Sequence, residues 1–279
     1  VIRVYLNVKP DIVFHLAAQP LVRKSFEDSI ETFNVNINGT VNLCEAMKNY
    51  PPKVFIGIVT DKIYEDKNWE YAYRENDILG GFDPYACSKV CMKYIIDSYK
   101  KSFLHDTYVA TTMAGNCLGG GDWGEDRIIP DIIRAYENKE KFKLRNPHHI
   151  RPWNYILDVL AGYLMLGEKL LEGKSEYQGA WNFGPDLESC ITTQLLINKC
   201  IKYWPELKDI CRYDKENDIK SDFHETKILR LDSTKARTHL GWKPKYSIDE
   251  TIDKTMEWYC KFFKGIVETN RQIEEYEKI

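Results

Sequence analysis

Three short apolar runs, separated by helical segments, most tightly limit the fold of this 279-residue chain. They are "DIVFHLAA" (11–18), "KVFIGIVT" (53–60) and "TYVATTMAG" (107–115). Nearly continuous apolar character is typical of parallel strands that are covered on both faces. Helices are expected between the runs, over 27–49 and from about residue 83 onward. This alternation predicts right-handed βαβ units, and therefore an α/β fold with a doubly wound parallel sheet.

The pattern changes beyond about residue 120, where the expected elements become shorter and more mixed. Helices are expected near 126–139, 155–173, 192–203 and 248–264, and short strands near 141–145, 179–184 and 226–231. These elements predict a smaller α/β lobe. We therefore expect residues 1–125 to hold the sheet and 126–279 to form mainly a substrate lobe, interleaved with the first region.

Composition excludes several classes of function. The net charge of −3 and the pI near 6.1 argue against a nucleic-acid partner. No run reaches the roughly 18 apolar residues that cross a membrane, and no signal peptide opens the sequence, so a cytoplasmic location is expected. The eight cysteines form no Cys-x-x-Cys pair, which indicates reduced thiols. The six histidines are scattered, and no metal site is expected.

Polar side chains follow each of the three predicted strands. His15 and the loop after it follow the first strand, Thr60, Asp61 and Lys62 the second, and Asn116 the third. In doubly wound sheets, ligands bind at the carboxyl ends of the strands. The sequence therefore predicts that these side chains line one crevice.

A candidate catalytic pair lies at the start of the next helix. Asp83 is a good N-cap residue and Pro84 a good first helical residue. Tyr85 and Lys89 are then four residues apart on one helix face. We expect the ammonium to lower the pKa of the tyrosine, which favours a base that works near neutral pH. The spacing alone is also common for surface pairs, so the adjoining strand end carries much of the argument.

These motifs resemble a known family. Tyr85-x-x-x-Lys89, Thr60 and "HLAAQ" resemble the NAD-dependent sugar-nucleotide epimerases and dehydratases, which are extended short-chain dehydrogenases/reductases. "GGGDWGEDRIIPD" and "RPWNYILD" resemble its CDP-glucose 4,6-dehydratase subgroup, and the matching stretches cover nearly the whole chain in order. The resemblance implies a Rossmann-like fold, NAD as cofactor, a CDP-hexose substrate and a homodimer. It also implies a lyase that makes a deoxysugar for lipopolysaccharide or another surface polysaccharide.

The resemblance implies a redox-neutral dehydration. Tyr85, assisted by Lys89 and Thr60, removes the proton from the sugar 4-hydroxyl while hydride leaves C4 for NAD. Asp61, when protonated, donates to the leaving oxygen on C6, and hydride returns to C6 to give the 4-keto-6-deoxy sugar. In the related dTDP-glucose dehydratases a glutamate that acts as the C5 base stands in the position of Lys62. Whether Lys62 acts as a neutral base or stabilises the enolate stays open.

The same resemblance implies the binding residues. It assigns cofactor contacts to His15, Ala17, Ala18, Gln19, Tyr85 and Lys89. It assigns substrate contacts to Asn116 near the diphosphate, to Arg127 and Arg151 as forked donors, and to Trp153, which stacks or merely packs. Asn36 matches an asparagine that supports the active-site strands, and Asp158 is expected to be structural.

One part of the family pattern is not in this sequence. The family opens with a strand, a G-x-x-G-x-x-G turn and a helix, which bind the cofactor pyrophosphate. Here the glycine-rich "GGGDWGED" comes only after the third run. We expect a truncated sequence, whose strand at 11–18 is left with an open edge. Two alternatives remain: a 4-epimerase, which needs no acid aimed at C6, and a catalytically inactive nucleotide-binding fragment.

Overall fold

A four-stranded parallel sheet forms the centre of the first lobe in the computed structural model, which describes residues 2–211 and 225–279. Its strand order is β1-β2-β3-β6, with β1 at Ile12–His15, β2 at Val54–Ile58, β3 at Tyr108–Ala114 and β6 at Gly179–Phe183. The three apolar runs form the first three strands, in parallel register. The predicted α/β fold with a parallel sheet is confirmed. Because β6 comes from the second half of the chain, the two regions interleave.

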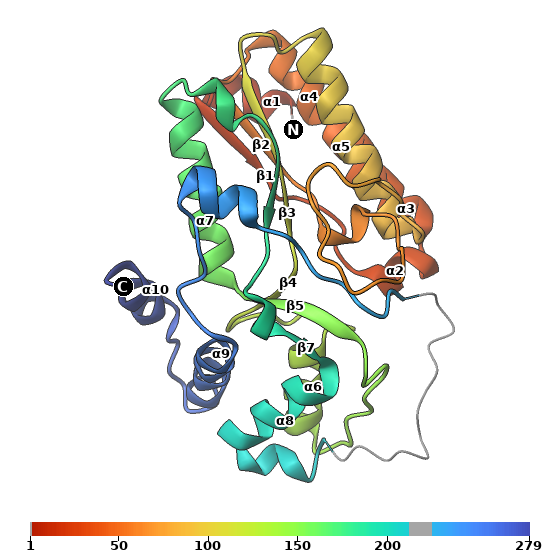
Figure 1. Ribbon diagram of the computed structural model, residues 1–279, viewed down its shortest axis with the longest axis vertical. Coiled ribbons are helices and arrows are strands. Elements are labelled where there is room, and N and C mark those ends of the chain that lie inside the picture. Colours follow the sequence, from red (N-terminus) through yellow and green to blue (C-terminus); the bar gives the residue numbers. More distant parts are fainter. Residues whose placement is uncertain (1, 212–224) are drawn as a thin grey trace.

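Helices cover both faces of this sheet (Figure 1). On one face lie α1 (Ile2–Val8), α4 (Gly39–Asn49) and α5 (Pro84–Ser102), which share a core with Phe55 and Val109. On the other face lies α7 (Ile156–Leu171), which packs with Val54, Ile56 and Ala110. Successive strand side chains point to opposite faces, so strands covered on both sides must be apolar throughout.

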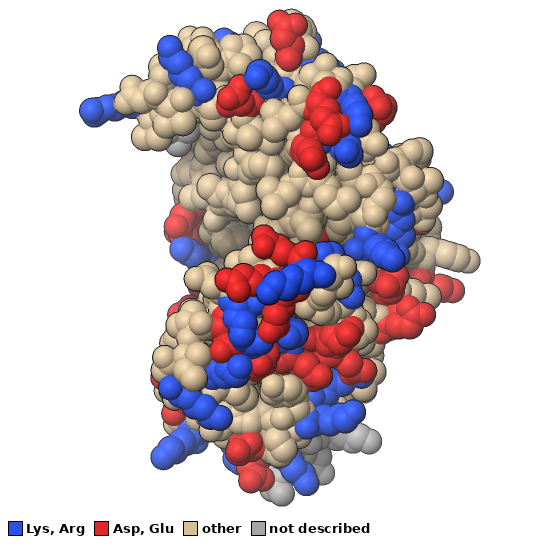
Figure 2. Space-filling model, turned by 90° about the vertical axis from the view of Figure 1, so that its left-hand side faces the viewer, with Lys and Arg blue, Asp and Glu red and all other residues tan. Residues whose placement is uncertain are grey.

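Strand β1 lies at the edge of the sheet and, within the described residues, pairs only with β2. The expected open edge is therefore present. An apolar groove of about 460 Å³ runs beside it, between Ile12 and Phe14 of β1 and Leu164 and Leu171 of α7. The face in Figure 2 is largely uncharged across the middle of its upper half, whereas Lys, Arg, Asp and Glu crowd its lower half.

The second lobe is built on a three-stranded sheet, ordered β4-β5-β7 (Figure 1). Its strands are β4 (Asn116–Leu118), β5 (Ile150–Tyr155) and β7 (Cys190–Thr192). Its helices are α6 (Ile128–Asn138), α8 (Thr193–Tyr203), α9 (Ile248–Phe262) and α10 (Thr269–Glu277). A large apolar core lies among these elements and includes Trp153 and Trp258.

Several expected elements differ in the structure. The predicted strand at 141–145 is wrong, and 226–231 contributes only isolated bridges, from Ile228 to Ile150 and from Leu231 to Tyr73. The expected helix 27–49 breaks at Asp28, whose side chain caps the next helix at Glu31 N. The segment becomes α2 (Val22–Glu27), α3 (Ser29–Phe33), a π-helix (Asn34–Asn38) and α4. Helix α10 and strand β5 were not predicted.

None of the described helices combines the length and apolar character that spanning a membrane requires. All eight cysteines are free thiols.

Candidate active site

The end of β2 places a hydroxyl beside a carboxyl group. Thr60 caps a single turn of 3₁₀-helix, Asp61–Ile63, and its Oγ1 accepts from Lys62 N at 3.4 Å and donates to Asp61 Oδ1 at 3.1 Å. Asp61 is 3% exposed, and its Oδ2 has no hydrogen-bond partner among the described residues. Burial raises the pKa of Asp61, against the opposing effects of Lys62 and the Thr60 hydrogen bond. The site therefore favours a protonated, neutral acid.

The start of α5 meets this strand end. Asp83 caps the helix by accepting from Ala86 N at 2.8 Å, and Tyr85 follows in the first turn. The Tyr85 phenol is buried and forms a side-chain hydrogen bond with Thr60. The Tyr85 backbone N–H also donates to Ser25 Oγ at 3.1 Å. Thr60, Asp61 and Tyr85 thus form one cluster, as the carboxyl-end rule predicts.

The expected lowering of the tyrosine pKa is wrong in this structure. Burial raises the pKa of Tyr85 to about 12, which outweighs the lowering by Thr60 and Arg127. The Lys89 ammonium instead donates to Ile58 O at 3.0 Å, and burial lowers the pKa of Lys89 to about 8. The i, i+4 spacing correctly places both groups on one face, but it does not report how much water they lose.

A cavity of about 870 Å³ opens at these strand ends and extends into the second lobe. Most of the residues predicted for the site line it: Ala18, Thr60, Asp61, Lys62, Tyr85, Lys89, Asn116, Arg127, Arg151 and Trp153. Their places in the cavity are structural facts, whereas their roles stay predictions. The residues that line the cavity therefore come from both lobes.

Three residues predicted for the cofactor lie outside the cavity lining. Ala17 is exposed, whereas His15 and Gln19 are buried. His15 Nε2 is 3.0 Å from Thr40 Oγ1, and burial lowers the pKa of this imidazole to about 4. The Gln19 amide donates to Thr32 Oγ1 at 2.8 Å. The buried side chains of His15 and Gln19 therefore hold the loop after β1 in place through hydrogen bonds in the protein interior.

Asn36, expected to support the active-site strands, and Asp158, expected to be structural, each join separate segments of the chain. Asn36 joins Gln19 O at 3.0 Å to Ser88 Oγ at 2.8 Å, and so ties the loop after β1 to α5. Asp158 Oδ1 accepts from Lys245 N and from the Tyr276 hydroxyl, both at 2.8 Å.

The cavity wall in the second lobe contains a charged group that the sequence did not reveal. Buried Arg151 donates to Glu225 Oε1 at 2.9 Å, and its Nη2 lies 3.2 Å from His149 Nδ1. Asn146 Nδ2 donates to the other oxygen of Glu225 at 2.6 Å. Although burial raises it, Arg151 and Lys62 lower the pKa of Glu225 to about 2. Because an arginine only donates, His149 accepts at Nδ1 and carries its proton on Nε2.

Tyr163, on α7, is a second phenol in the cavity lining. Burial raises the pKa of Tyr163 itself. Neither Tyr163 nor Glu225 lies in a motif that marks a site in sequence. Both are brought to the cavity by contacts between distant segments, and these contacts leave no local pattern.

The arrangement suits proton transfer to and from a polyhydroxylated ligand. It offers a phenol, a carboxyl group whose pKa burial raises and a lysine side chain within one cluster, and arginine donors in the same cavity lining. Among the described residues no group of three or more His, Cys, Asp or Glu side chains could hold a metal ion.

Comparison with known proteins places the chain among nucleotide-sugar enzymes. Residues 1–255 match the family model described as GDP-mannose 4,6 dehydratase. The chain is 38% identical over 279 residues to CDP-glucose 4,6-dehydratase of Salmonella typhimurium, with 96% of this chain and 76% of that protein covered. It is 27% identical over 270 residues to dTDP-D-glucose 4,6-dehydratase of Homo sapiens, with 96% and 74% covered.

Solved structures show the same fold. A dTDP-glucose 4,6-dehydratase of Streptomyces venezuelae, with NAD and TYD bound, superposes with a TM-score of 0.81 at 19% identity, covering 94% of this chain and 77% of that one. A UDP-glucose 4-epimerase of Thermotoga maritima, with UDP-glucose, gives 0.78 at 24% identity, covering 94% and 81%.

Proposed function

The chain belongs to the GDP-mannose 4,6-dehydratase family, and on that premise we propose that it dehydrates CDP-glucose to CDP-4-keto-6-deoxyglucose. The observation that carries this proposal is Asp61. It is buried at the end of β2, its raised pKa favours the protonated form, and it lies in the same cluster as Thr60 and Tyr85. A 4-epimerase needs the phenol but has no use for a second acid.

The proposal gives each group in the cluster one task. Tyr85 takes the proton of the sugar 4-hydroxyl, and its hydrogen bond to Thr60 and the charge of Arg127 both act toward a lower pKa. Asp61, whose pKa burial raises toward the protonated form, delivers a proton to the oxygen that leaves C6. Lys89 is fixed by Ile58 O and presents its ammonium to the cavity floor.

NAD is the cofactor that we propose for this reaction. Its chemistry, when bound, is to accept a hydride from the sugar and to return it. The cavity lining fits such a group at the carboxyl ends of β1 and β2, where Leu16 and Ala18 give small and apolar surface next to Lys89. Of the three N–H donors of the Lys89 ammonium, Ile58 O and Met92 Sδ accept two, which leaves one for a ligand.

The second lobe holds the nucleotide in this proposal. Asn116 and Arg127 lie where the cavity passes from the first lobe to the second, and both would face the diphosphate. Arg151 and Lys62 share the field of the Glu225 carboxylate. Because Lys62 lies in the field of this carboxylate, the proposal takes Lys62 as a stabiliser of the enolate and not as the C5 base.

The test is to incubate the protein with CDP-glucose and NAD and to follow the absorbance that 4-keto-6-deoxy sugars develop in alkali. We expect this signal with CDP-glucose and a weaker one with dTDP-glucose. Clean inversion at C4 without loss of water supports the epimerase instead. Binding of CDP without any turnover supports an inactive nucleotide-binding protein.

We further propose a homodimer, a cytoplasmic location and a role in deoxysugar supply for lipopolysaccharide. Apolar side chains on the helices beside the site support the dimer, since Ile30 of α3 is 74% exposed and Tyr94 of α5 is 57% exposed. The eight free thiols support a reducing compartment. Sedimentation of the purified protein tests the dimer directly.

A further inference from the structure

The glycine-rich loop between β4 and α6 packs directly against α9. A Cβ atom added to Gly120 would lie 1.9 Å from Trp258 Cγ, a separation that no side chain tolerates. Trp258 is 5% exposed and stacks on Phe262 with ring centroids 5.2 Å apart. Glycine at this position is therefore explained by close packing against an aromatic platform, not by contact with a phosphate.

Hydrogen bonds also join helix α9 to this loop. The Tyr259 hydroxyl, on α9, donates to Asp122 O at 2.6 Å. The Asp122 carboxylate accepts from Gly124 N at 3.0 Å, and Arg127 Nη1 donates to both of its oxygens at 3.1 and 3.0 Å. Asp122 thus joins helix α9 to a guanidinium at the cavity.

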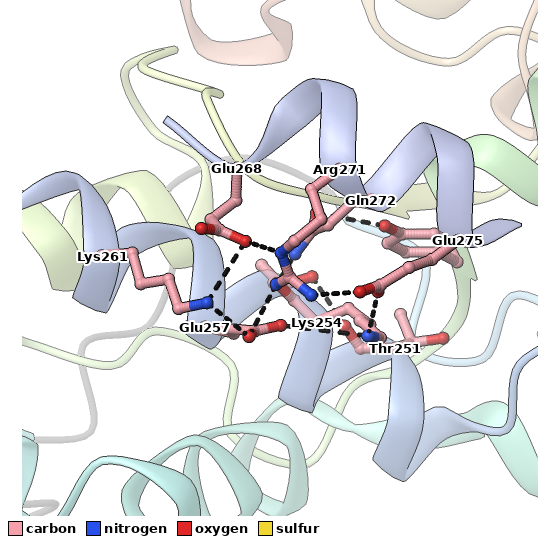
Figure 3. Close-up of polar contacts among 10 residues, drawn as sticks. Thr251, Lys254, Glu257, Lys261, Glu268, Arg271, Gln272 and Glu275 are labelled. Carbon is pink, nitrogen blue, oxygen red and sulfur yellow. Dashed lines mark hydrogen bonds and ion pairs between the residues drawn. The ribbon is translucent and has the colours of Figure 1, made fainter. Parts of the chain in front are cut away.

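Helix α9 is in turn held in place by contacts with α10. Trp258 Nε1 donates to Thr269 Oγ1 at 2.9 Å, at the start of α10. Arg271 of α10 pairs with Glu257 of α9 at 2.7 Å, and also pairs with Glu268 and Glu275 (Figure 3). The platform therefore has support on both sides, from α10 and from the core of the second lobe.

Arg127 has donors left for a ligand. Asp122 and Arg127 both line the cavity, and the arginine side chain is 42% exposed. Its charge reaches the cluster, because it lowers the pKa of Tyr85 and of Cys117 against the effect of burial. Within the described chain only Nη1 of this guanidinium has a hydrogen bond, so Nε and Nη2 are available to a bidentate anion.

We propose that Asp122 and Tyr259 are positioning residues for the diphosphate of the nucleotide. Tyr259 fixes the main chain of the loop at Asp122, and the Asp122 carboxylate holds Arg127 with its free edge toward the cavity. The inference deepens the proposed function and rests on it, because it takes the ligand to be a nucleoside diphosphate.

Calorimetric titration with CDP tests this directly, independently of turnover. One lost hydrogen bond of about 1 kcal/mol weakens binding about fivefold, which we expect for Tyr259→Phe. Loss of the charged partner in Asp122→Asn should weaken binding about tenfold. Tyr155→Phe is the matched control, because its hydroxyl bonds Gln272 at 3.3 Å in the same region but not the loop. It should bind CDP within about twofold of the wild type.

A double-mutant cycle separates positioning from general damage to the fold. If Asp122 acts through Arg127, Asp122→Asn should cost no further affinity in an Arg127→Met background. An equal loss in both backgrounds overturns the inference and leaves the proposed function intact. Wild-type protein that binds no CDP overturns the proposed function and the inference with it.

Discussion

Two groups of polar side chains in this molecule use the same chemical types in opposite surroundings. At the strand ends, Asp61, Tyr85 and Lys89 are at least nine-tenths buried and have few partners. On the surface, the ion pairs between α9 and α10 centre on Arg271, which is 39% exposed and has three carboxylate partners (Figure 3). These helices lie in the charged lower half of Figure 2.

The difference appears in the charge states. Burial raises the pKa of Asp61, raises that of Tyr85 to about 12 and lowers that of Lys89 to about 8, so every charged form in the cluster is disfavoured. In the α9–α10 pairs, hydrogen bonding to Lys254, and then Arg271, lowers the pKa of Glu275. Polar groups that burial holds near neutrality can exchange protons with a substrate, whereas paired surface charges stabilise the fold. The cluster is thus suited to chemistry and the surface pairs to stability.

The largest expected effect is on turnover. Tyr85→Phe removes the group that takes the proton from the sugar, so we expect product formation to fall about 10³-fold. The unfolding free energy should change by no more than about 1 kcal/mol, because the ring remains and a single hydrogen bond is lost. Tyr99→Phe, on the same helix but bonded to Glu45, is the control and should retain its activity. Comparable turnover in the two variants would contradict the assigned role.

Asp61→Asn should separate the two halves of the reaction. The amide cannot donate a proton as an acid does, so water loss should slow about 10²-fold while reduction of the cofactor by CDP-glucose persists. Product analysis and nicotinamide absorbance measure the two steps. Full dehydration by this variant would remove Asp61 from the mechanism.

Asp61→Asn should also be more stable than the wild type at pH values above about 4, the ordinary pKa of an aspartate carboxyl group. With a raised folded-state pKa, the native protein keeps its proton at pH values where the unfolded chain has lost it. Wild-type stability relative to Asp61→Asn should therefore be highest below about pH 4 and should fall as the pH rises. Urea unfolding of the wild type and of Asp61→Asn at several pH values measures this difference in stability.

Lys89→Met should show the opposite pH dependence. The folded pKa of about 8 lies below the unfolded value of about 10.4. Below pH 8 both states are protonated and the native state bears the full cost of a buried ammonium. We expect the methionine variant to be about 2 kcal/mol more stable at pH 7, after about 1 kcal/mol for the lost bond to Ile58 O. The difference in unfolding free energy between Lys89→Met and the wild type should narrow toward pH 10. The reason is that the lysine of the folded protein loses its proton at a lower pH than the lysine of the unfolded chain.

Lys93→Met is the matched control for this titration. Lys93 lies on the same helix but pairs with Asp97 at 2.7 Å. Its unfolding free energy should differ from that of the wild type by about 1 kcal/mol or less, since a single partly exposed ion pair contributes little. A pH-independent gap for both lysines would show that Lys89 is protonated throughout this range.

The sequence predicts the first lobe well because its evidence is local. Apolar runs covered on both faces mark β1, β2 and β3, and the residues after them necessarily meet at one edge of the sheet. Strand β5 was missed because "IRPWNY" carries Pro152 and Arg151, which argue against a central strand. Its backbone pairs with β4 on one side and with β7 on the other.

The electrostatics of the site could not be predicted in the same way. Tyr85 and Lys89 are visible in sequence, but the loss of solvent that reverses the expected tyrosine pKa is a property of the packed molecule. Glu225 reaches Arg151 across 74 residues of sequence, and no local pattern indicates that contact. Roles that depend on burial or on distant partners therefore require coordinates.

The smallest expected effect concerns the ion pairs between α9 and α10. Arg271→Met keeps the aliphatic stem but removes the three ion pairs of a partly exposed arginine, so we expect the melting temperature to fall by about 2 °C at low salt. Because salt screens exposed charges, the difference should largely vanish in about 1 M sodium chloride. Turnover should stay within about twofold of the wild type, since Trp258 keeps its bond to Thr269 and α9 keeps its core contacts. A loss of activity without a loss of stability would mean that the surface pairs act on the site and not only on the fold.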